Sequence, residues 1–374
     1  MRRLVLAGLG HAHLPVLRAW ARGELGGAAL HVVAPPDYHY SGMIPGVVAG
    51  VYTPEQARLD PAALCRAAGA AYTPARVRRV DAAARRLRLD DGGTLDYDLL
   101  SLDLGSRPAG LELPGVAEHA FAVRPLEQVL RFREAAERAC ARASATAPAR
   151  LAIVGGGAAG VELAFCLHAA LTRRHRRERV RLRLLEAGET ILAGYTPRLQ
   201  RRAQRLLRGR GVEVRTAVRV EAAEAGALQT SAGPLPCDAV LWAGGPRAPR
   251  LLRASGLPTD AEGWLRVETT LRAVGLDDVF GAGDCAALEG YGWMAKAGVY
   301  AVRQGPLLAR NLAHALAARP LERYRPQRHW LSLLNTGDGR ALLAYRGLVL
   351  HGRAAWRLKD AIDRAYLRRV RPGS

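Results

Sequence analysis

Residues 151–160 read Leu-Ala-Ile-Val-Gly-Gly-Gly-Ala-Ala-Gly, a short apolar run that enters a glycine-rich turn. Glycines at 155, 157 and 160 allow a tight turn and the close approach of a pyrophosphate to the start of a helix. The residues from Val161 to Ala170 have the composition of that helix. We therefore predict that Gly155, Gly157 and Gly160 hold a dinucleotide, with its phosphates at the helix N-terminus.

An acidic residue follows this turn at the distance that such a unit requires. Glu186 ends the apolar run from Val180 to Leu185, about 26 residues after Gly160, where a carboxylate accepts hydrogen bonds from both ribose hydroxyls. Ala187 comes next, so no arginine stands beside it to bind a 2′-phosphate. The sequence therefore favours NADH over NADPH; the alternative is a surface glutamate at the end of a strand.

A second glycine turn lies near the N-terminus and departs further from the pattern. Gly8 and Gly10 follow an apolar strand, but His13 stands in place of the third glycine, and Ala34 stands where a ribose-binding acid is usual. We predict that Gly8, Gly10, His11 and His13 contact a second dinucleotide. The alternative is that the two histidines only fill space at the start of the helix.

The segment Val279 to Asp284 indicates which dinucleotide the first turn binds. Its Gly283 and Asp284 follow a short apolar strand, and the carboxylate can hold the ribityl or pyrophosphate end of a flavin. We therefore predict FAD at the N-terminal turn and NADH at the second turn. One dinucleotide can reduce the other if the two sites face each other, which predicts an oxidoreductase.

These motifs resemble the pyridine nucleotide-disulfide oxidoreductase superfamily of FAD flavoproteins, in particular type II NADH dehydrogenases. Three further segments, at residues 40–46, 296–305 and 356–364, resemble a subgroup found fused ahead of selenide, water dikinase. The resemblance implies an α/β fold with two Rossmann-like domains arranged as in glutathione reductase. It also implies that Pro45, Gly244 and Gly298 belong to the cofactor sites, the last at the start of a helix under the flavin.

The order of the motifs predicts a discontinuous FAD domain at residues 1–110 and 265–320, with the NAD(H) domain at 111–264 between its two parts. Within these domains we expect helices at residues 126–143 and 298–316. The remaining residues, 321–374, are few for the dimerisation domain that disulfide reductases carry.

The C-terminal region predicts one amphipathic helix. Its apolar residues, Trp356, Ile362, Tyr366 and Val370, can line one side, with arginines on the other faces, as in a helix that lies on an anionic membrane. The alternative is a helix packed on its own flavin domain or on a second subunit of a homodimer, because Asp360 and Asp363 interrupt the basic faces.

The cysteines argue against a thiol relay. Ser41 stands in the region where disulfide reductases of the superfamily carry their redox cysteines, and a serine hydroxyl cannot form a sulfenic acid or a disulfide. The five cysteines have no pair or metal-ligand spacing, so we expect reduced core residues and no metal: Cys65, Cys140, Cys166, Cys237 and Cys285.

The sequence offers two candidate catalytic residues, the first from the family resemblance and the second from its rarity in this chain. Glu162 follows Gly160 and is expected to point toward the flavin edge, where it relays a proton; a buried carboxylate stabilised by the helix dipole is the alternative. Lys296 is one of two lysines among 55 basic residues and is placed near the flavin or its acceptor, with a solvated loop lysine as the alternative. Val299 replaces the glutamine of the family's quinone slot, so a quinone and a chalcogen species both stay open as acceptor.

Composition limits the remaining classes of function. The net charge of +21 is almost all arginine, and the basic runs lack interleaved aromatic residues, so we expect no nucleic-acid partner. No apolar run approaches the length of a membrane-spanning helix. We expect a cytoplasmic protein, either free or peripheral on the inner face of the membrane. Two further hypotheses are a redox partner in selenium or sulfur metabolism and a non-catalytic protein that binds FAD and NADH.

Overall fold

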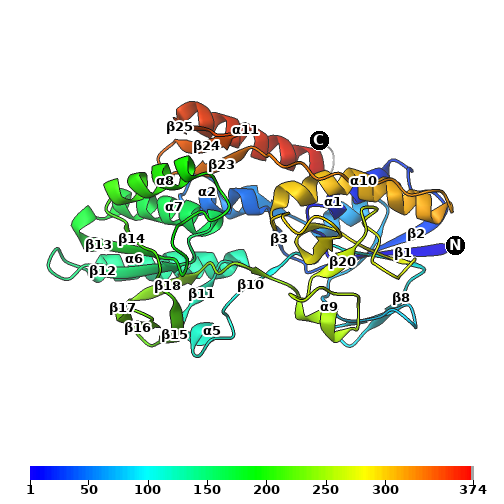
Figure 1. Cartoon of the computed structure of the whole chain (residues 1–374), viewed down its shortest axis with the longest axis horizontal. Helices are drawn as coiled ribbons and strands as arrows, with labels where there is room; N and C mark the ends of the chain where they lie inside the picture. Colours follow the sequence, from blue (N-terminus) through cyan, green and yellow to red (C-terminus); the bar gives the residue numbers. More distant parts are fainter. Residues whose placement is uncertain (372–374) are drawn as a thin grey trace.

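The computed structural model describes residues 1–371, which form two α/β domains side by side with a small C-terminal unit above them (Figure 1). The helices are α1 His13–Ala21, α2 Ile44–Val48, α3 Pro54–Ala57, α4 Pro61–Ala67, α5 Val116–His119, α6 Leu126–Arg142, α7 Ala158–Arg174, α8 Pro197–Gly209, α9 Arg250–Ala254, α10 Gly298–Leu316 and α11 Arg353–Val370. The predicted helices at 126–143 and 298–316 are therefore confirmed. Among residues 1–371, no helix is both long and apolar enough to cross a membrane.

The first domain is built on a parallel sheet in the order β21-β9-β1-β2-β5. Its strands are β1 Arg2–Ala7, β2 Ala28–Val33, β5 Ala71–Thr73, β9 Leu99–Leu102 and β21 Val279–Gly281. Because β1 has β2 on one side and β9 on the other, a crevice opens at its carboxyl end, and ligands of such sheets bind there. Helices α1 and α10 pack against each other beside this crevice.

The second domain repeats this arrangement in the order β11-β18-β12-β13-β14. Its strands are β11 Phe121–Ala122, β12 Ala149–Val154, β13 Val180–Leu185, β14 Glu213–Arg215 and β18 Ala239–Trp242. Strand β12 lies between β13 and β18, so the second glycine turn also opens at a crevice. The predicted α/β fold with two Rossmann-like domains is confirmed.

The remaining strands form small sheets around the two domains. They are β3 Tyr38–His39, β4 Arg58–Leu59, β6 Val77–Asp81, β7 Arg86–Leu89, β8 Thr94–Asp96, β10 Arg107–Pro108, β15 Val220–Glu224, β16 Ala227–Thr230, β17 Gly233–Pro236, β19 Pro246–Arg247, β20 Leu265–Val267, β22 Ala286–Leu288, β23 Ser332–Asn335, β24 Ala341–Tyr345 and β25 Leu348–Gly352. Three short 3-10 turns cover Ser41–Met43, Arg177–Arg179 and Gly283–Cys285.

The chain crosses between the domains at β10 and β19, which pair antiparallel. After β19 it is back in the first domain, because Leu252 and Leu257 pack in that core. The predicted return at residue 265 is therefore too late. In the opposite direction, Ile44 and Val48 of α2 pack in the core of the second domain, although their segment belongs to residues 1–110.

Strands β23 to β25 and helix α11 form a C-terminal unit that spans both domains. Leu334 and Leu342 join the second core, whereas Leu367 and Val370 join the first. The unit therefore packs on its own chain, which is one of the alternatives from the sequence. The predicted apolar side of α11 is wrong in one respect: Ile362 is 42% exposed, and the buried face carries Lys359 and Asp363 instead.

Candidate dinucleotide and electron-transfer site

The second glycine turn is shaped to receive an anion. Gly155 has a left-handed φ of +112°, and a side chain there would collide with the carbonyl of Ala243. A side chain at Gly160 would collide with the carbonyl of Gly155, whereas the space beside Gly157 is open. Helix α7 begins after this turn without a side-chain cap. Its first N–H groups are therefore left for a phosphate, and the residues fit a dinucleotide.

Glu186 lies directly against this turn. Its Oε2 accepts a hydrogen bond from the N–H of Gly156 at 2.6 Å, and its Oε1 accepts one from the N–H of Gly188 at 2.7 Å. Two backbone donors fix the carboxylate, and each oxygen keeps a second lone pair for a ribose hydroxyl. The geometry therefore fits the predicted ribose contact.

The first glycine turn differs, because a buried carboxylate accepts hydrogen bonds at the N-terminus of the helix that follows it. Oδ2 of Asp103, at the end of β9, accepts hydrogen bonds from the N–H groups of Ala12 at 2.8 Å and His13 at 3.1 Å. The ring of His13 lies beneath the turn, with Nδ1 2.6 Å from the carbonyl of Gly8 and Nε2 2.8 Å from Oγ of Ser101. Both ring nitrogens are bonded within the protein, so His13 supports the turn from inside.

His11 instead stands in a cluster of aromatic rings. Its Nδ1 lies 2.8 Å from the hydroxyl of Tyr38 and 3.2 Å from that of Tyr366. The ring of Tyr40 lies edge-on to His11 and stacks on Tyr366 at 4.8 Å between centroids. These rings therefore join the first turn to α11, and we name them the His11 cluster: His11, Tyr38, Tyr40 and Tyr366.

Helix α10 brings an uncapped N-terminus to the same place. It begins at Gly298 without a side-chain cap, and a Cβ at Gly298 would lie 3.1 Å from the His11 ring. Asp284, in the turn before it, accepts a hydrogen bond from Oγ of Ser106 at 3.1 Å. Gly283 donates its N–H to Oε1 of Gln304 at 2.8 Å. Gly283 thus lies beside Asp103 and Gly298 beside His11, and a shared cofactor site that includes Asp284 stays a prediction.

Lys296 has contacts that hold its own segment in place. Its Nζ donates to the carbonyl of Ala286 at 2.5 Å and lies 4.3 Å from the ring centre of Trp264. Burial lowers the pKa of Lys296, which Asp284 and other nearby acidic groups oppose. These contacts favour a structural role, and a catalytic one stays a prediction.

A buried charged network joins the two domains through α11. Nζ of Lys359 lies 3.6 Å from Oε1 of Glu162 and donates to Oδ2 of Asp363 at 3.1 Å and to the carbonyl of Gly42 at 3.0 Å. The hydroxyl of Tyr40 donates to Oδ1 of Asp363 at 3.0 Å. We name these residues the Lys359 network: Glu162, Lys359, Asp363 and Tyr40. Through Tyr40 it is continuous with the His11 cluster.

Two carboxylates share one ammonium in this network, and all three groups are at most 8% exposed. Burial raises the pKa of Glu162 and of Asp363, while Lys359 opposes both shifts. One positive charge does not neutralise two negative charges in a buried site, so a carboxylate of this network takes up a proton more readily than it would in water. Glu162 therefore lies where a proton can be stored between the domains.

The five cysteine thiols differ from the charged groups of the Lys359 network, because burial keeps them protonated. Burial raises the pKa of Cys65, Cys140 and Cys237 to about 11, that of Cys285 to about 12, and that of Cys166 well above its usual value. None is paired in a disulfide. Thiols that stay protonated are poor nucleophiles, which agrees with the absence of a relay predicted from Ser41.

Two predicted cofactor residues lie at the joint between the domains. Pro45 is buried at the start of α2, which packs on α7. A side chain at Gly244 would collide with the carbonyl of Ala109, whose N–H donates to Gly245 at 2.8 Å. Both residues shape the crossing between the domains, and direct contact with a cofactor stays a prediction.

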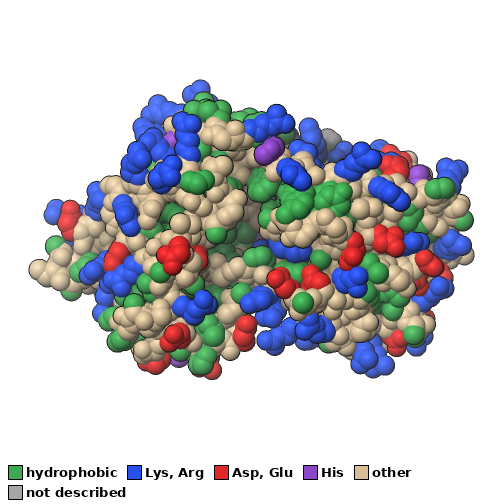
Figure 2. All heavy atoms as spheres, viewed as in Figure 1, with side chains coloured by type: hydrophobic (Ala, Val, Ile, Leu, Met, Phe, Trp, Pro, Cys, Tyr) green, Lys and Arg blue, Asp and Glu red, His purple; other side chains and the backbone are tan. Residues whose placement is uncertain are grey.

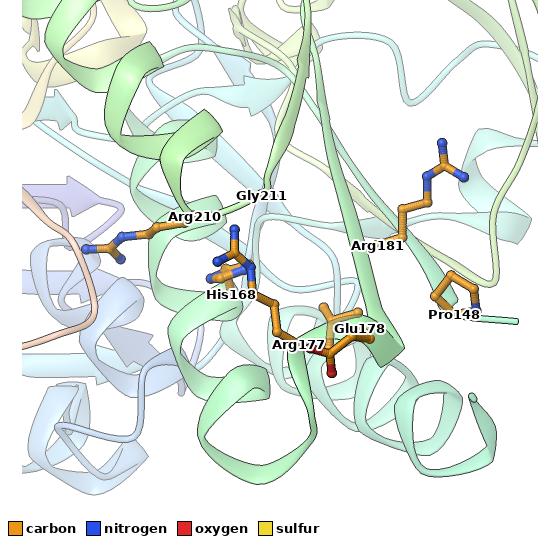
Figure 3. Close-up of a pocket in the computed structure, with 8 residues that line it drawn as sticks. Pro148, His168, Arg177, Glu178, Arg181, Arg210 and Gly211 are labelled. Carbon is orange, nitrogen blue, oxygen red and sulfur yellow. The ribbon is translucent and has the colours of Figure 1, made fainter. Parts of the chain in front are cut away.

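A separate hollow of about 490 Å³ lies at the amino ends of β12 and β13 (Figure 3). It is lined by Pro148, His168, Arg177, Glu178, Val180, Arg181, Arg210 and Gly211. Arg210 points away from the hollow in Figure 3, and it pairs with Asp338 at 2.6 Å. The glycine turn is at the opposite, carboxyl ends of these strands, so this hollow is not the dinucleotide site.

Sequence reasoning missed four residues of the site: Asp103, Ser106, Lys359 and Asp363. A signal existed for Lys359, since it is the second of only two lysines in an arginine-rich chain. Asp103 could have been found by aligning residues 98–105 with residues 238–245, the segments that contain β9 and β18. Ser106 and Asp363 carry no signal in their own neighbourhood.

Two Rossmann-like sheets, each with a glycine turn at the carboxyl end of its central strand and joined by a buried charged network, define a two-dinucleotide oxidoreductase. The family model for pyridine nucleotide-disulphide oxidoreductases matches residues 2–314. The chain therefore belongs to the pyridine nucleotide-disulphide oxidoreductase family.

Relatives narrow the type within this family. The NADH dehydrogenase-like protein MT1860 of Mycobacterium tuberculosis is 33% identical over 228 residues, covering 59% of this chain and 56% of that protein. The demethylphylloquinone reductase NdbB of Synechocystis is 31% identical over 299 residues, covering 77% of this chain and 72% of NdbB. The match therefore spans little more than half the length of the first relative. The resemblance to NADH dehydrogenase-like proteins is confirmed.

A solved structure shares the whole architecture. The sulfide:quinone oxidoreductase of Aquifex aeolicus superposes with a TM-score of 0.85 at 17% identity, covering 100% of this chain and 92% of that one. At this identity the likeness supports the fold alone.

Proposed function

We propose that this protein is an FAD-dependent NADH:quinone oxidoreductase that works without a redox-active thiol. The net reaction converts NADH, one proton and a quinone into NAD⁺ and a quinol. Bound FAD supplies the two-electron step between the nicotinamide and the acceptor. The hydride carries two electrons and one proton, so the protein must provide the second proton from solvent.

The observation that carries the proposal is the Lys359 network between the two crevices. Glu162 comes from the helix of the NADH turn, and Tyr40 comes from the segment beside the first turn. A buried group of two carboxylates and one ammonium can hold a proton and release it without a large rearrangement. It therefore suits a reaction that consumes one proton per turnover.

The remaining residues have binding roles. Gly155, Gly157 and Gly160 with Glu186 would hold NADH. Gly8, Gly10 and Asp284 with the start of α10 would hold FAD, and the uncapped amides of α10 favour negative charge at that end of the site.

A quinone suits the acceptor side for two reasons. NdbB is named as a demethylphylloquinone reductase, and the His11 cluster offers a wall of aromatic rings with hydroxyl and imidazole donors. Rings of this kind pack against a planar acceptor. Their hydroxyls, which bond to His11 and Asp363 in this structure, would be the donors to its carbonyl oxygens. Val299 differs from the family's glutamine, so polar contacts to the quinone would come from these rings instead.

Steady-state NADH oxidation with a panel of acceptors tests the proposal. We expect turnover with short-chain quinones and little with polysulfide or selenite. Turnover with chalcogen species alone would instead make the protein a redox partner in sulfur or selenium metabolism. Binding of both cofactors without turnover would make it a binding protein.

We further propose that the C-terminal unit contacts the membrane surface, where quinones are found. Its exposed apolar residues are Tyr345, Leu348, Leu350, Leu358 and Ile362. Basic side chains gather over α8 and this unit at the upper left of Figure 2. Exposed leucines beside arginines are typical of surfaces that lie on anionic lipid.

Vesicle sedimentation tests this contact. We expect binding to vesicles that contain an anionic lipid, and loss of binding in Leu348→Ser/Leu350→Ser. Val51→Ser is a matched control, because Val51 is also exposed but lies outside the unit. Equal sedimentation of all three proteins would show that this unit does not bind membrane, and self-association without lipid would support the homodimer.

A further inference from the structure

The two glycine turns of this chain are held by equivalent backbone hydrogen bonds. Gly8 donates its N–H to the carbonyl of Val33 at 2.8 Å, as Gly155 does to that of Leu185. The strand on the other side of each central strand, β9 or β18, ends at the turn in the same way. Asp103 donates its N–H to the carbonyl of Ala7 at 3.0 Å, and Ala243 donates its N–H to the carbonyl of Val154 at 2.7 Å. Asp103 and Ala243 therefore hold equivalent positions.

This one difference changes what each helix N-terminus offers. In the second turn the alanine methyl leaves the first amides of α7 uncapped. In the first turn the Asp103 carboxylate accepts hydrogen bonds from Ala12 and His13. It also fills the space next to two glycines, since a Cβ at Gly10 or at Gly283 would lie 2.5 Å from it. The protein thus carries a built-in anion at its own anion-binding turn.

We propose that Asp103 makes FAD binding depend on a proton: its carboxylate and the FAD pyrophosphate compete for the first amides of α1, so FAD binds best when Asp103 is protonated. The inference rests on FAD at the first turn and not on the identity of the acceptor. A protonated Asp103 no longer repels the phosphates and gains an O–H that can donate to them. The proton comes from solvent and returns to it when FAD leaves.

The charges around Asp103 support this linkage. Asp103 is 4% exposed, and burial raises its pKa to about 6, which the bonds from Ala12 and His13 oppose. The titratable groups that face it are His11 and His13 of the first turn, Asp284 and Cys285 of the following turn, Tyr38 and Tyr366. Burial lowers the pKa of both histidines, that of His13 to about 4. Among residues 1–371, no salt bridge neutralises Asp103.

The test measures FAD affinity against pH by quenching of flavin fluorescence in the apoprotein. We expect the Kd of the unmodified protein to rise by up to about tenfold per pH unit between pH 6.5 and 8.5, the slope of one linked proton. Asp103→Asn and Asp103→Ala should bind tightly and equally at all these pH values. Burial lowers the pKa of both histidines, and both are kept in the Asp103 variants, so loss of the slope in these variants assigns it to Asp103.

Two further variants test the role of the carboxylate within the same protein. Ala243→Asp places the carboxylate in the second turn, and we expect NADH binding to weaken with rising pH while FAD binding keeps its usual profile. Asp278→Asn removes a carboxylate that pairs with Arg85 at the other end of β21, and it should keep the slope.

A flat pH profile in the unmodified protein would overturn the proposal. So would Asp103→Asn with weaker FAD binding at pH 8, since that result would make the carboxylate a required cap. Because only binding is measured, failure of quinone turnover would leave this result unchanged. Circular dichroism identifies any variant that does not fold, and the profile of the unmodified protein then decides alone.

Discussion

Replacing Lys359 by methionine removes the single positive charge from the Lys359 network. Glu162 and Asp363 are then left as two buried carboxylates, 8% and 4% exposed. Removing one partner of a buried ion pair costs about 3–5 kcal/mol, because the remaining charge is unpaired. We expect a loss of this size in the free energy of unfolding at pH 8, measured by urea unfolding.

The pH dependence gives the direction of the effect. Burial raises the pKa of Glu162 and of Asp363, and loss of Lys359 raises both further. The folded variant then binds more protons than the unfolded chain, so its stability falls as pH rises. For one additional proton the difference between pH 5.5 and pH 8 is up to about 3 kcal/mol. The variant should therefore be nearer to the unmodified protein at pH 5.5.

Lys296→Met is the matched control, because it removes the only other lysine. Its cation–π contact with Trp264 is worth about 0.5–2 kcal/mol, and no pair of carboxylates depends on it. Glu162→Gln combined with Lys359→Met should recover part of the loss. In stopped flow, Lys359→Met should slow reoxidation by quinone and leave reduction by NADH intact. Equal losses at both pH values, or equal losses in the two lysine variants, would refute the reasoning.

Three further predictions concern the cofactor sites and the thiols. Glu186→Ala should lower kcat/KM for NADH about 5- to 150-fold, the effect of about 1–3 kcal/mol, and narrow its advantage over NADPH; equal use of both nucleotides by the unmodified protein would contradict this. Asp284→Ala should raise the Kd for FAD in fluorescence titration, because it removes a charged acceptor, and an unchanged Kd would contradict it. Replacing all five cysteines by alanine or serine should spare NADH-to-dye activity, and a thiolate-to-flavin charge-transfer band in the unmodified protein would contradict that.

The sequence predicted the parts of this fold that depend on local pattern. The strand Val180–Leu185 and the helix Gly298–Leu316 have the predicted bounds, since the strand has a run of apolar residues that ends at Glu186 and the helix begins at a glycine and has an apolar repeat. The return crossing was misplaced because β19 has only two residues, Pro246 and Arg247, and no pattern of its own. Strand β19 takes its structure from pairing with β10, which is 139 residues earlier in the sequence.

The site was predicted where its residues adjoin a motif, and missed where they arrive from elsewhere. Glu162 stands two residues after Gly160 and was found, but its partner Lys359 is on α11, far along the chain. The arginine-rich composition suggested a helix with one apolar and one basic side. The buried face instead carries Lys359 and Asp363, because Glu162 on α7 and Gly42 bond to Lys359, and Tyr40 bonds to Asp363.

Two sites of this protein, at Asp103 and in the Lys359 network, bury carboxylates with too few positive charges beside them. Asp103 and the pair of Glu162 and Asp363 are buried carboxylates with fewer positive charges than negative ones around them. Such groups cost stability when ionised, so a fold keeps them where holding or releasing a proton has a use. At Asp103 that use would be the binding of an anionic cofactor, and at Glu162 it would be the proton that quinone reduction consumes. Two single variants therefore give the sharpest test. Asp103→Asn should alter FAD affinity without changing the rate of reoxidation, and Glu162→Gln should slow reoxidation without changing FAD affinity.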